Sequence, residues 1–100
     1  MENFKIQFKI LLDLFKSRSD KAEMFCKELI KSNPQYAILY NIMGLIKSEQ
    51  KRYDEAISFY NTGIKVQPDF AMIYNNLGSL YKLKQEYNKA ENYYKKSINF

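Results

Sequence analysis

The sequence predicts an all-α protein in which a helix hairpin repeats along the chain. The stretch NPQYAILYNIMG at residues 33–44 recurs as QPDFAMIYNNLG at residues 67–78. Within and after these stretches, apolar residues recur at three- and four-residue steps, which is the period of an amphipathic helix. A fixed repeat of this length is typical of stacked supersecondary units, because each hairpin has an apolar face that only another hairpin can cover.

The repeat period is the separation of Pro34 and Pro68 along the chain. A fainter copy precedes it, because residues 20–31 match residues 54–65 at five positions. We therefore expect one domain over residues 1–100 with three units: a divergent unit at about 1–33, a second at 37–68 and a truncated third at 71–100. The same offset joins eight pairs: Ala37 and Ala71, Tyr40 and Tyr74, Asn41 and Asn75, Gly44 and Gly78, Tyr53 and Tyr87, Ala56 and Ala90, Tyr60 and Tyr94, Ile64 and Ile98.

Each complete unit is predicted to contain two helices. In the second unit these cover residues 37–49 and 54–66, with the polar stretch SEQKR as the turn. Asp54 and Glu55 lie at a helix start, where a carboxylate favours the dipole and can act as a cap. Pro68 ends the second helix because proline cannot continue the hydrogen-bond ladder. The third unit repeats this order over residues 70–83 and 87–99.

Small residues are predicted to let the helices of a hairpin approach closely. Gly44 and Gly78 fall inside helices, where Gly costs about 1 kcal/mol relative to Ala. We expect Ala56 and Ala90 to form the opposite wall. The tyrosines at the paired positions would fill the space between hairpins, and Cys26, which takes the place of Tyr60 in the first unit, would be a small core residue.

The first unit departs from the exact period. Stepping back from the second unit by the full period would place the charged Lys9 and Asp13 between helices, which is costly. An offset that is shorter by one position places Ile10, Leu11 and Leu14 there instead. We therefore expect the turn around Ser17–Ser19 to be one residue shorter than the others.

Taken together, these residues resemble the tetratricopeptide repeat. The second unit carries the pattern in the order Tyr40, Met43-Gly44, Tyr53, Ala56, Tyr60 and Pro68, and the third repeats it from Tyr74 to Tyr94. The resemblance covers residues 20–100 well and residues 1–19 poorly. It implies a right-handed superhelix (solenoid) of antiparallel helix hairpins, about six helices in all, whose concave groove binds a peptide or another protein.

The groove that the resemblance implies would be lined by the first helix of each unit. Its apolar side chains favour an apolar or amphipathic partner segment, and its Asn side chains can both donate to and accept from a peptide backbone. Family members that capture chaperone carboxylates use a clamp of Lys, Asn and Arg, and the sequence excludes this function because none of the equivalent residues is basic. The expected groove residues are Phe8, Leu12, Phe15, Ile38, Asn41, Ile42, Leu45, Met72, Asn75, Asn76 and Ser79.

Composition argues against several other functions. The chain has no His and one Cys, which excludes His-based catalysis, zinc-finger spacings and an intramolecular disulfide, so we expect no metal, no cofactor and no enzymatic activity. The net charge of +5 comes from dispersed Lys, with only two Arg, and does not favour nucleic acid. No apolar run approaches the ~20 residues of a membrane span, and the charged N-terminus is unlike a signal peptide, so a cytoplasmic location is expected.

Two alternatives to a protein-interaction module stay open. The chain could be the N-terminal arm of a larger enzyme, for example a transferase, or a self-assembling structural module. The third unit stops inside its second helix, which would leave Tyr81, Tyr93, Ile98 and Phe100 without a neighbour on one side. Further repeats would cover these residues, or a homodimer would do so through the uncapped third unit, with a dissociation constant that we expect to be micromolar or weaker.

Overall fold

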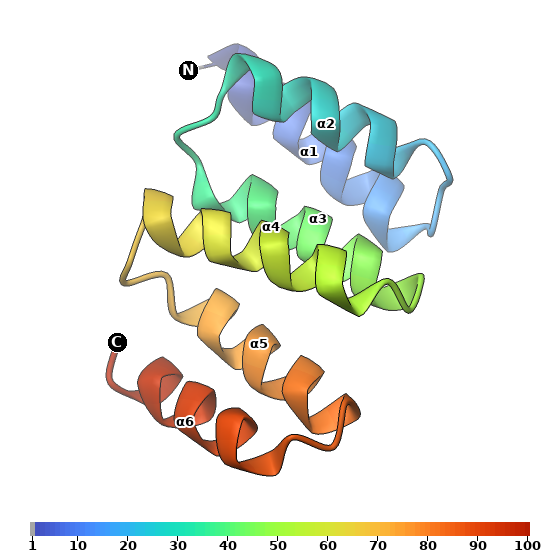
Figure 1. The fold of residues 1–100 in the computed structure, drawn as a ribbon. Helices are drawn as coiled ribbons and strands as arrows, with labels where there is room; N and C mark the ends of the chain where they lie inside the picture. The colour runs from blue at the N-terminus through green and yellow to red at the C-terminus, as the bar shows by residue number, and fades with distance from the viewer. Residues whose placement is uncertain (1) are drawn as a thin grey trace. The chain divides into compact units, whose positions relative to one another are not determined.

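The computed structural model describes residues 2–100, and these form six α-helices and no strand (Figure 1). The predicted all-α fold of helix hairpins is confirmed, and the four helices predicted in the second and third units have their observed ends within one residue of the prediction. The helices are α1 Glu2–Lys16, α2 Ala22–Ser32, α3 Ala37–Glu49, α4 Tyr53–Val66, α5 Ala71–Leu83 and α6 Tyr87–Ile98.

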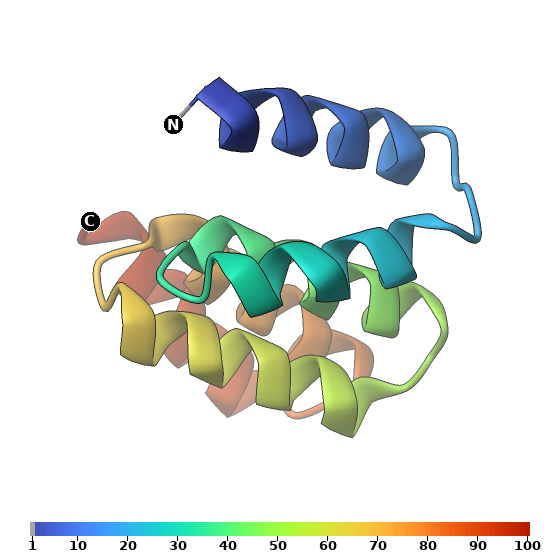
Figure 2. The ribbon, with the colours of Figure 1, turned by 90° about the horizontal axis from the view of Figure 1, so that it is seen from above.

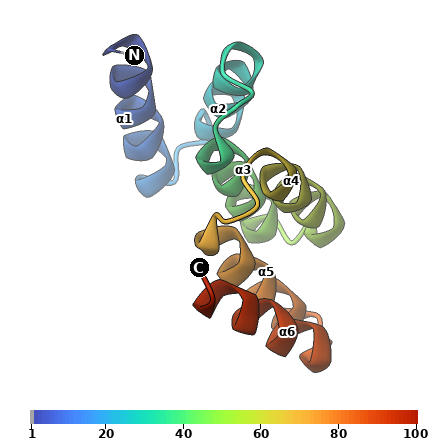
Figure 3. The same cartoon turned by 90° about the vertical axis from the view of Figure 1, so that its left-hand side faces the viewer.

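The helices divide into two compact units, one that ends at Pro34 and a second over Gln35–Phe100. The first holds α1 and α2, which are joined by the turn at residues 17–21 (Figure 2). Its buried side chains come from both helices: Leu11, Ala22, Cys26 and Leu29. The second unit holds two hairpins, α3–α4 and α5–α6, with α5 packed against both α3 and α4 (Figure 3).

The prediction that the first turn is one residue shorter than the others is not borne out by the helix ends, because residues 17–21 are non-helical there, against residues 50–52 in the second unit. Each turn contains one residue with a left-handed φ, namely Arg18 at 57°, Lys51 at 63° and Gln85 at 63°. The paired alanines that follow are Ala56 and Ala90, five residues after Lys51 and Gln85, but Ala22 follows Arg18 by only four. The chain is thus one residue shorter between the left-handed residue and the alanine that follows, while the non-helical turn itself is longer because α2 begins later.

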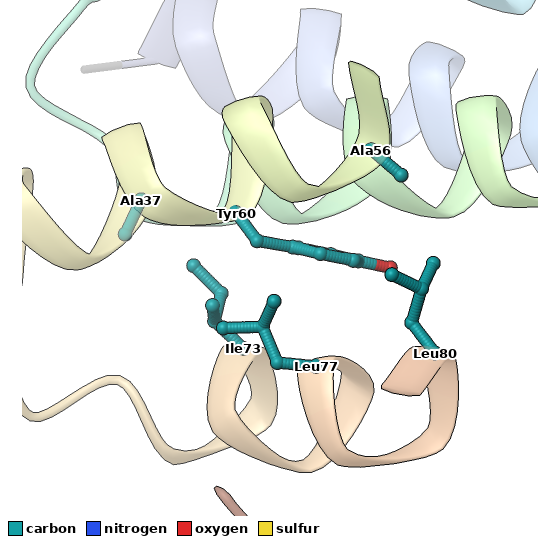
Figure 4. Close-up of a cluster of buried hydrophobic side chains, with 6 residues drawn as sticks. All are labelled: Ala37, Ala56, Tyr60, Ile73, Leu77 and Leu80. Carbon is teal, nitrogen blue, oxygen red and sulfur yellow. The ribbon is translucent and has the colours of Figure 1, made fainter. Parts of the chain in front are cut away.

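The core of the second unit lies between α4 and α5. The side chain of Tyr60 extends from α4 across the apolar side of α5, with Ile73 and Leu77 beneath it and Leu80 at its hydroxyl end (Figure 4). Ala37 and Ala56 complete the cluster, in which every side chain is at most 1% exposed. Tyr60 therefore fills the space between hairpins, as predicted for its position.

The atoms nearest to the helical glycines belong to tyrosine rings, a contact that the sequence did not predict. A Cβ on Gly44 would lie 2.6 Å from Tyr60 Cζ, and a Cβ on Gly78 would lie 2.8 Å from Tyr94 Cδ1. Real Cβ atoms essentially never approach another atom so closely. The glycines therefore make room for tyrosine rings of the same hairpin.

The sequence suggested that the carboxylates at helix starts act as caps, but in the structure they do not cap by hydrogen bonding. No described N-cap residue makes a side-chain cap bond, and Glu86, the N-cap of α6, pairs with Lys89 at 3.3 Å instead. Asp54 pairs with Lys84 at 3.4 Å, which joins α4 to the turn of the next hairpin. The acidic residues of the first turn of α4 still complement its dipole.

We expect Gly44→Ala to lower the free energy of unfolding by about 1–3 kcal/mol through overpacking against the Tyr60 ring, although Ala is the better helix former. Gly44→Leu should cost at least as much. Ser58→Ala, at an exposed position of α4, is the control and should change little. In a Tyr60→Leu background, the effect of Gly44→Ala should vanish or reverse. Chemical denaturation measures the wild type and each variant, and an unchanged midpoint for Gly44→Ala would contradict this packing.

The Cys26 thiol is fully buried, and its burial raises its pKa to about 12, as expected of a core residue. Because an unfolded thiol ionises near pH 8.5, the folded state loses stability as pH rises from about 8.5 towards 12. The wild type should lose up to ~1.4 kcal/mol per pH unit there, and Cys26→Ala should lose less. Urea titrations between about pH 8.5 and 9.5 are suitable, because both proteins contain the same tyrosines and only one contains the thiol. Equal slopes for the two proteins would refute a buried thiol.

Candidate functional site

The residues predicted to line the groove lie on α1, α3 and α5. Those on α1 are Phe8, Leu12 and Phe15, which are half-buried, and the Phe8 ring stacks on Phe4 with centroids 5.8 Å apart. They belong to the first compact unit. A groove that they share with α3 and α5 stays a prediction.

On α3, the predicted residues are less accessible than the sequence suggested. Ile38 and Leu45 are half-buried, but Asn41 is only 1% exposed and Ile42 only 3%. The Asn41 side-chain oxygen accepts a hydrogen bond of 2.7 Å from the Asn76 amide of α5. Asn41 therefore links two neighbouring hairpins, and it offers a partner little surface in this structure.

On α5, the predicted residues surround an open pocket of about 300 Å³. Met72 is 55% exposed and Asn75 is also exposed, whereas Asn76 is half-buried and turned towards Asn41. The pocket is lined by Ala71, Met72, Asn75, Asn76 and Ser97. It combines one long apolar side chain with amides and a hydroxyl, and none of its lining residues carries a charge.

A second hollow of about 490 Å³ lies farther along the same hairpin. Ser79, the last predicted residue, is exposed there, and its hydroxyl shares a hydrogen bond of 3.0 Å with the Tyr94 hydroxyl. Leu83 and Tyr87 are each 62% exposed. The lining residues are Ser79, Lys82, Leu83, Gln85, Tyr87 and Tyr94.

Both hollows include residues of α6 that the sequence analysis did not place at a site. Ser97 and Tyr94 follow Gly63 and Tyr60 by one repeat length. In the preceding hairpin these two positions are buried, since Gly63 lies against Ile73 and Tyr60 is 1% exposed. Their alignment with Gly63 and Tyr60 in the repeat could therefore have identified Ser97 and Tyr94 as residues near a site.

Neither a metal site nor a membrane-spanning helix is found among the described residues. Among residues 2–100, no three His, Cys, Asp or Glu side chains are close enough to hold a metal ion. No described helix is long and apolar enough to cross a membrane. Burial raises the pKa of the Tyr60 and Tyr74 phenols, so these two side chains stay neutral and pack as core groups.

Comparisons with known proteins agree with this geometry. A family model described as "TPR repeat" matches residues 44–85, and a "Tetratricopeptide repeat" model matches residues 71–100. The search of curated proteins found no match.

Solved structures of MamA are similar to this chain. One, 29% identical, has a TM-score of 0.72 over 78% of this chain and 46% of its own. MamA MSR-1 and MamA AMB-1 are each 18% identical, with TM-scores of 0.81 and 0.80 over 95% and 96% of this chain, and 55% and 53% of theirs. This chain therefore spans about half the length of the structures that it matches, and the likeness supports a solenoid of helix hairpins.

The Asn41–Asn76 bond provides a test of how the α3–α5 surface is held. Asn76→Ala should destabilise the protein by about 1–3 kcal/mol, because the buried Asn41 oxygen would lose its donor. In an Asn41→Leu background, the same substitution should cost much less. Asn75→Ala, one residue away and exposed, is the matched control. A double-mutant cycle by denaturation measures the coupling, and additive effects would show that the bond contributes nothing.

Proposed function

Residues 44–100 belong to the tetratricopeptide-repeat family, and on that premise we propose that the protein is an interaction module that binds an apolar or amphipathic peptide segment along α3 and α5. Repeats of this family generally serve protein interaction or assembly rather than catalysis. The observation that carries the proposal is the uncharged pocket in which Met72 and Asn75 are exposed side by side.

The chemistry of this pocket favours one kind of segment. Met72 offers a flexible apolar surface that adapts to different partner side chains. Asn75 offers a donor and an acceptor within reach of a peptide backbone. An acidic tail would need basic partners, and no lining residue of this pocket is basic.

The α3–α5 surface is also held in place before any partner arrives. The Asn76–Asn41 bond fixes α5 against α3, and the apolar core behind it is at most 1% exposed. A surface that is already ordered loses less conformational freedom on binding, which favours affinity. That Phe8, Leu12 and Phe15 of α1 also contact the partner stays a prediction from the sequence.

A selection from a displayed library of random peptides tests the proposal. We expect wild-type protein to enrich apolar or amphipathic peptides, and Met72→Lys to lose them while keeping its helical circular dichroism. Met72 is a better site for the charge than Ile42, whose burial would confuse lost binding with misfolding. Asn75→Ala should weaken binding without abolishing it.

Thr62→Lys, an equally charged change at an exposed position of α4, is the control and should bind like wild type. Enrichment of acidic tails, or binding that falls steeply with salt, would contradict an uncharged groove. Peptides retained by Met72→Lys would show that this pocket is not the site.

A further inference from the structure

The face of α5–α6 that corresponds to the covered face of α3–α4 is exposed. In α3–α4, Tyr53, Ile64 and Val66 pack against the core that α5 completes. The residues one repeat later are Tyr87, Ile98 and Phe100, and they are 62%, 81% and 59% exposed. Tyr94, which corresponds to the buried Tyr60, is only half-buried. The structure thus contains one covered and one uncovered copy of the same surface.

The covered copy shows what fits this surface. It is α5, whose Ile73, Leu77 and Leu80 form a stripe at positions i, i+4 and i+7 that is at most 1% exposed (Figure 4). A second copy of the stripe, on α3, consists of Leu39, Met43 and Ile46 and is also buried.

A third copy of the stripe lies on α1 and is exposed. The left-handed turn residues Arg18 and Lys51 set the offset between α1 and α3, which is the separation of these two residues along the chain. With that offset, Ile6 and Ile10 take the places of Leu39 and Met43, and they are 59% and 44% exposed. Apolar side chains of this kind in a row mark a surface that another helix face can cover.

We propose that copies of this chain associate head to tail, with α1 of one copy covering the α5–α6 face of the next. The contact would repeat the packing of α5 on α3–α4, so its geometry is already present in the fold. Because it joins two different surfaces, it is heterologous and produces open chains of copies unless the rotation closes a ring. This inference is independent of the groove proposal, since it uses other residues.

One polar substitution in the stripe supports this pairing. The place of Leu80 is taken on α1 by Asp13, which is exposed. In the covered interface, Leu80 lies at the hydroxyl end of Tyr60 (Figure 4). The corresponding hydroxyl on the exposed face is that of Tyr94. It shares a hydrogen bond with the Ser79 hydroxyl, and it can accept that bond while it donates to a carboxylate. Asp13 would therefore have a partner in the contact between copies.

A homodimer of two α5–α6 faces, the arrangement expected from the sequence, fits less well. Each such face belongs to a hairpin that carries five Lys and two Glu over residues 71–100, a net charge of +3. Two of them in contact would repel each other, and neither would supply an exposed stripe of the α5 kind, because Ile73, Leu77 and Leu80 are buried in their own chain.

Sedimentation of the full chain from micromolar to millimolar concentration tests the proposal. We expect the mean mass of the wild type to rise beyond that of a dimer. Ile10→Lys and Ile98→Lys should each be monomeric with unchanged helicity, and an equimolar mixture of the two should form a dimer and nothing larger, because each retains the surface that the other has lost. Ile6→Lys should reproduce the Ile10→Lys result.

Met24→Lys is the matched control, because Met24 is 68% exposed on α2 and belongs to neither surface. It should assemble like the wild type. Three results would overturn the proposal: a wild type that is monomeric at millimolar concentration, an Ile10→Lys variant that still dimerises, or a mixture of the two variants that stays monomeric.

Discussion

The contact between a tyrosine ring and a helical glycine is the constraint on which the rest of the second unit depends. The Tyr60 ring occupies the space where a side chain of residue 44 would lie, and this is why the hairpin requires Gly at that position. The same ring packs against Ile73 and Leu77 of α5 (Figure 4). One side chain therefore packs within its own hairpin and also forms the contact with the next hairpin. A bulkier residue 44 would disturb both interfaces together, because a close-packed interior has no spare volume to receive the ring.

The repeat preserves this geometry while its polar chemistry changes. Lys47 and Glu55 form an ion pair of 3.6 Å across the α3–α4 hairpin. In α5–α6 the equivalent residues are Tyr81 and Lys89, and the Lys89 ammonium lies 5.4 Å from the centre of the Tyr81 ring. An ion pair has thus been replaced by a cation–π contact that joins the same two positions of the hairpin. The two contacts differ in burial, since the Lys47 side chain is 4% exposed and that of Lys89 is 61% exposed, yet each joins the same two helices of its hairpin.

The period and the apolar pattern were sufficient to predict a fold of about six helices and the ends of α3 to α6, because these depend on spacing along the chain. The contacts of single residues were not predictable in the same way. Ala56 and Tyr60 are one helical turn apart on the same side of α4, so the pattern alone could not predict that the Tyr60 ring lies against Gly44. The accessibility of Asn41 was misjudged for a related reason: the repeat aligns it with Asn75, but its bond is to Asn76, since stacked hairpins do not bring equivalent positions into contact.

The residues of the two proposed surfaces explain how peptide binding and assembly could coexist. On α5, Ile73, Leu77 and Leu80 face the preceding hairpin, whereas Met72 and Asn75 lie on the exposed part of the same helix. Head-to-tail association would use Ile6 and Ile10 of α1 and Ile98 of α6, none of which lines the pocket beside Met72. A chain of copies would then present one pocket for each copy along its length. A partner with several apolar segments would bind such an array far more tightly than a single copy, because every segment after the first binds at a high effective concentration. Weak contacts between copies and weak binding in each pocket would therefore reinforce each other.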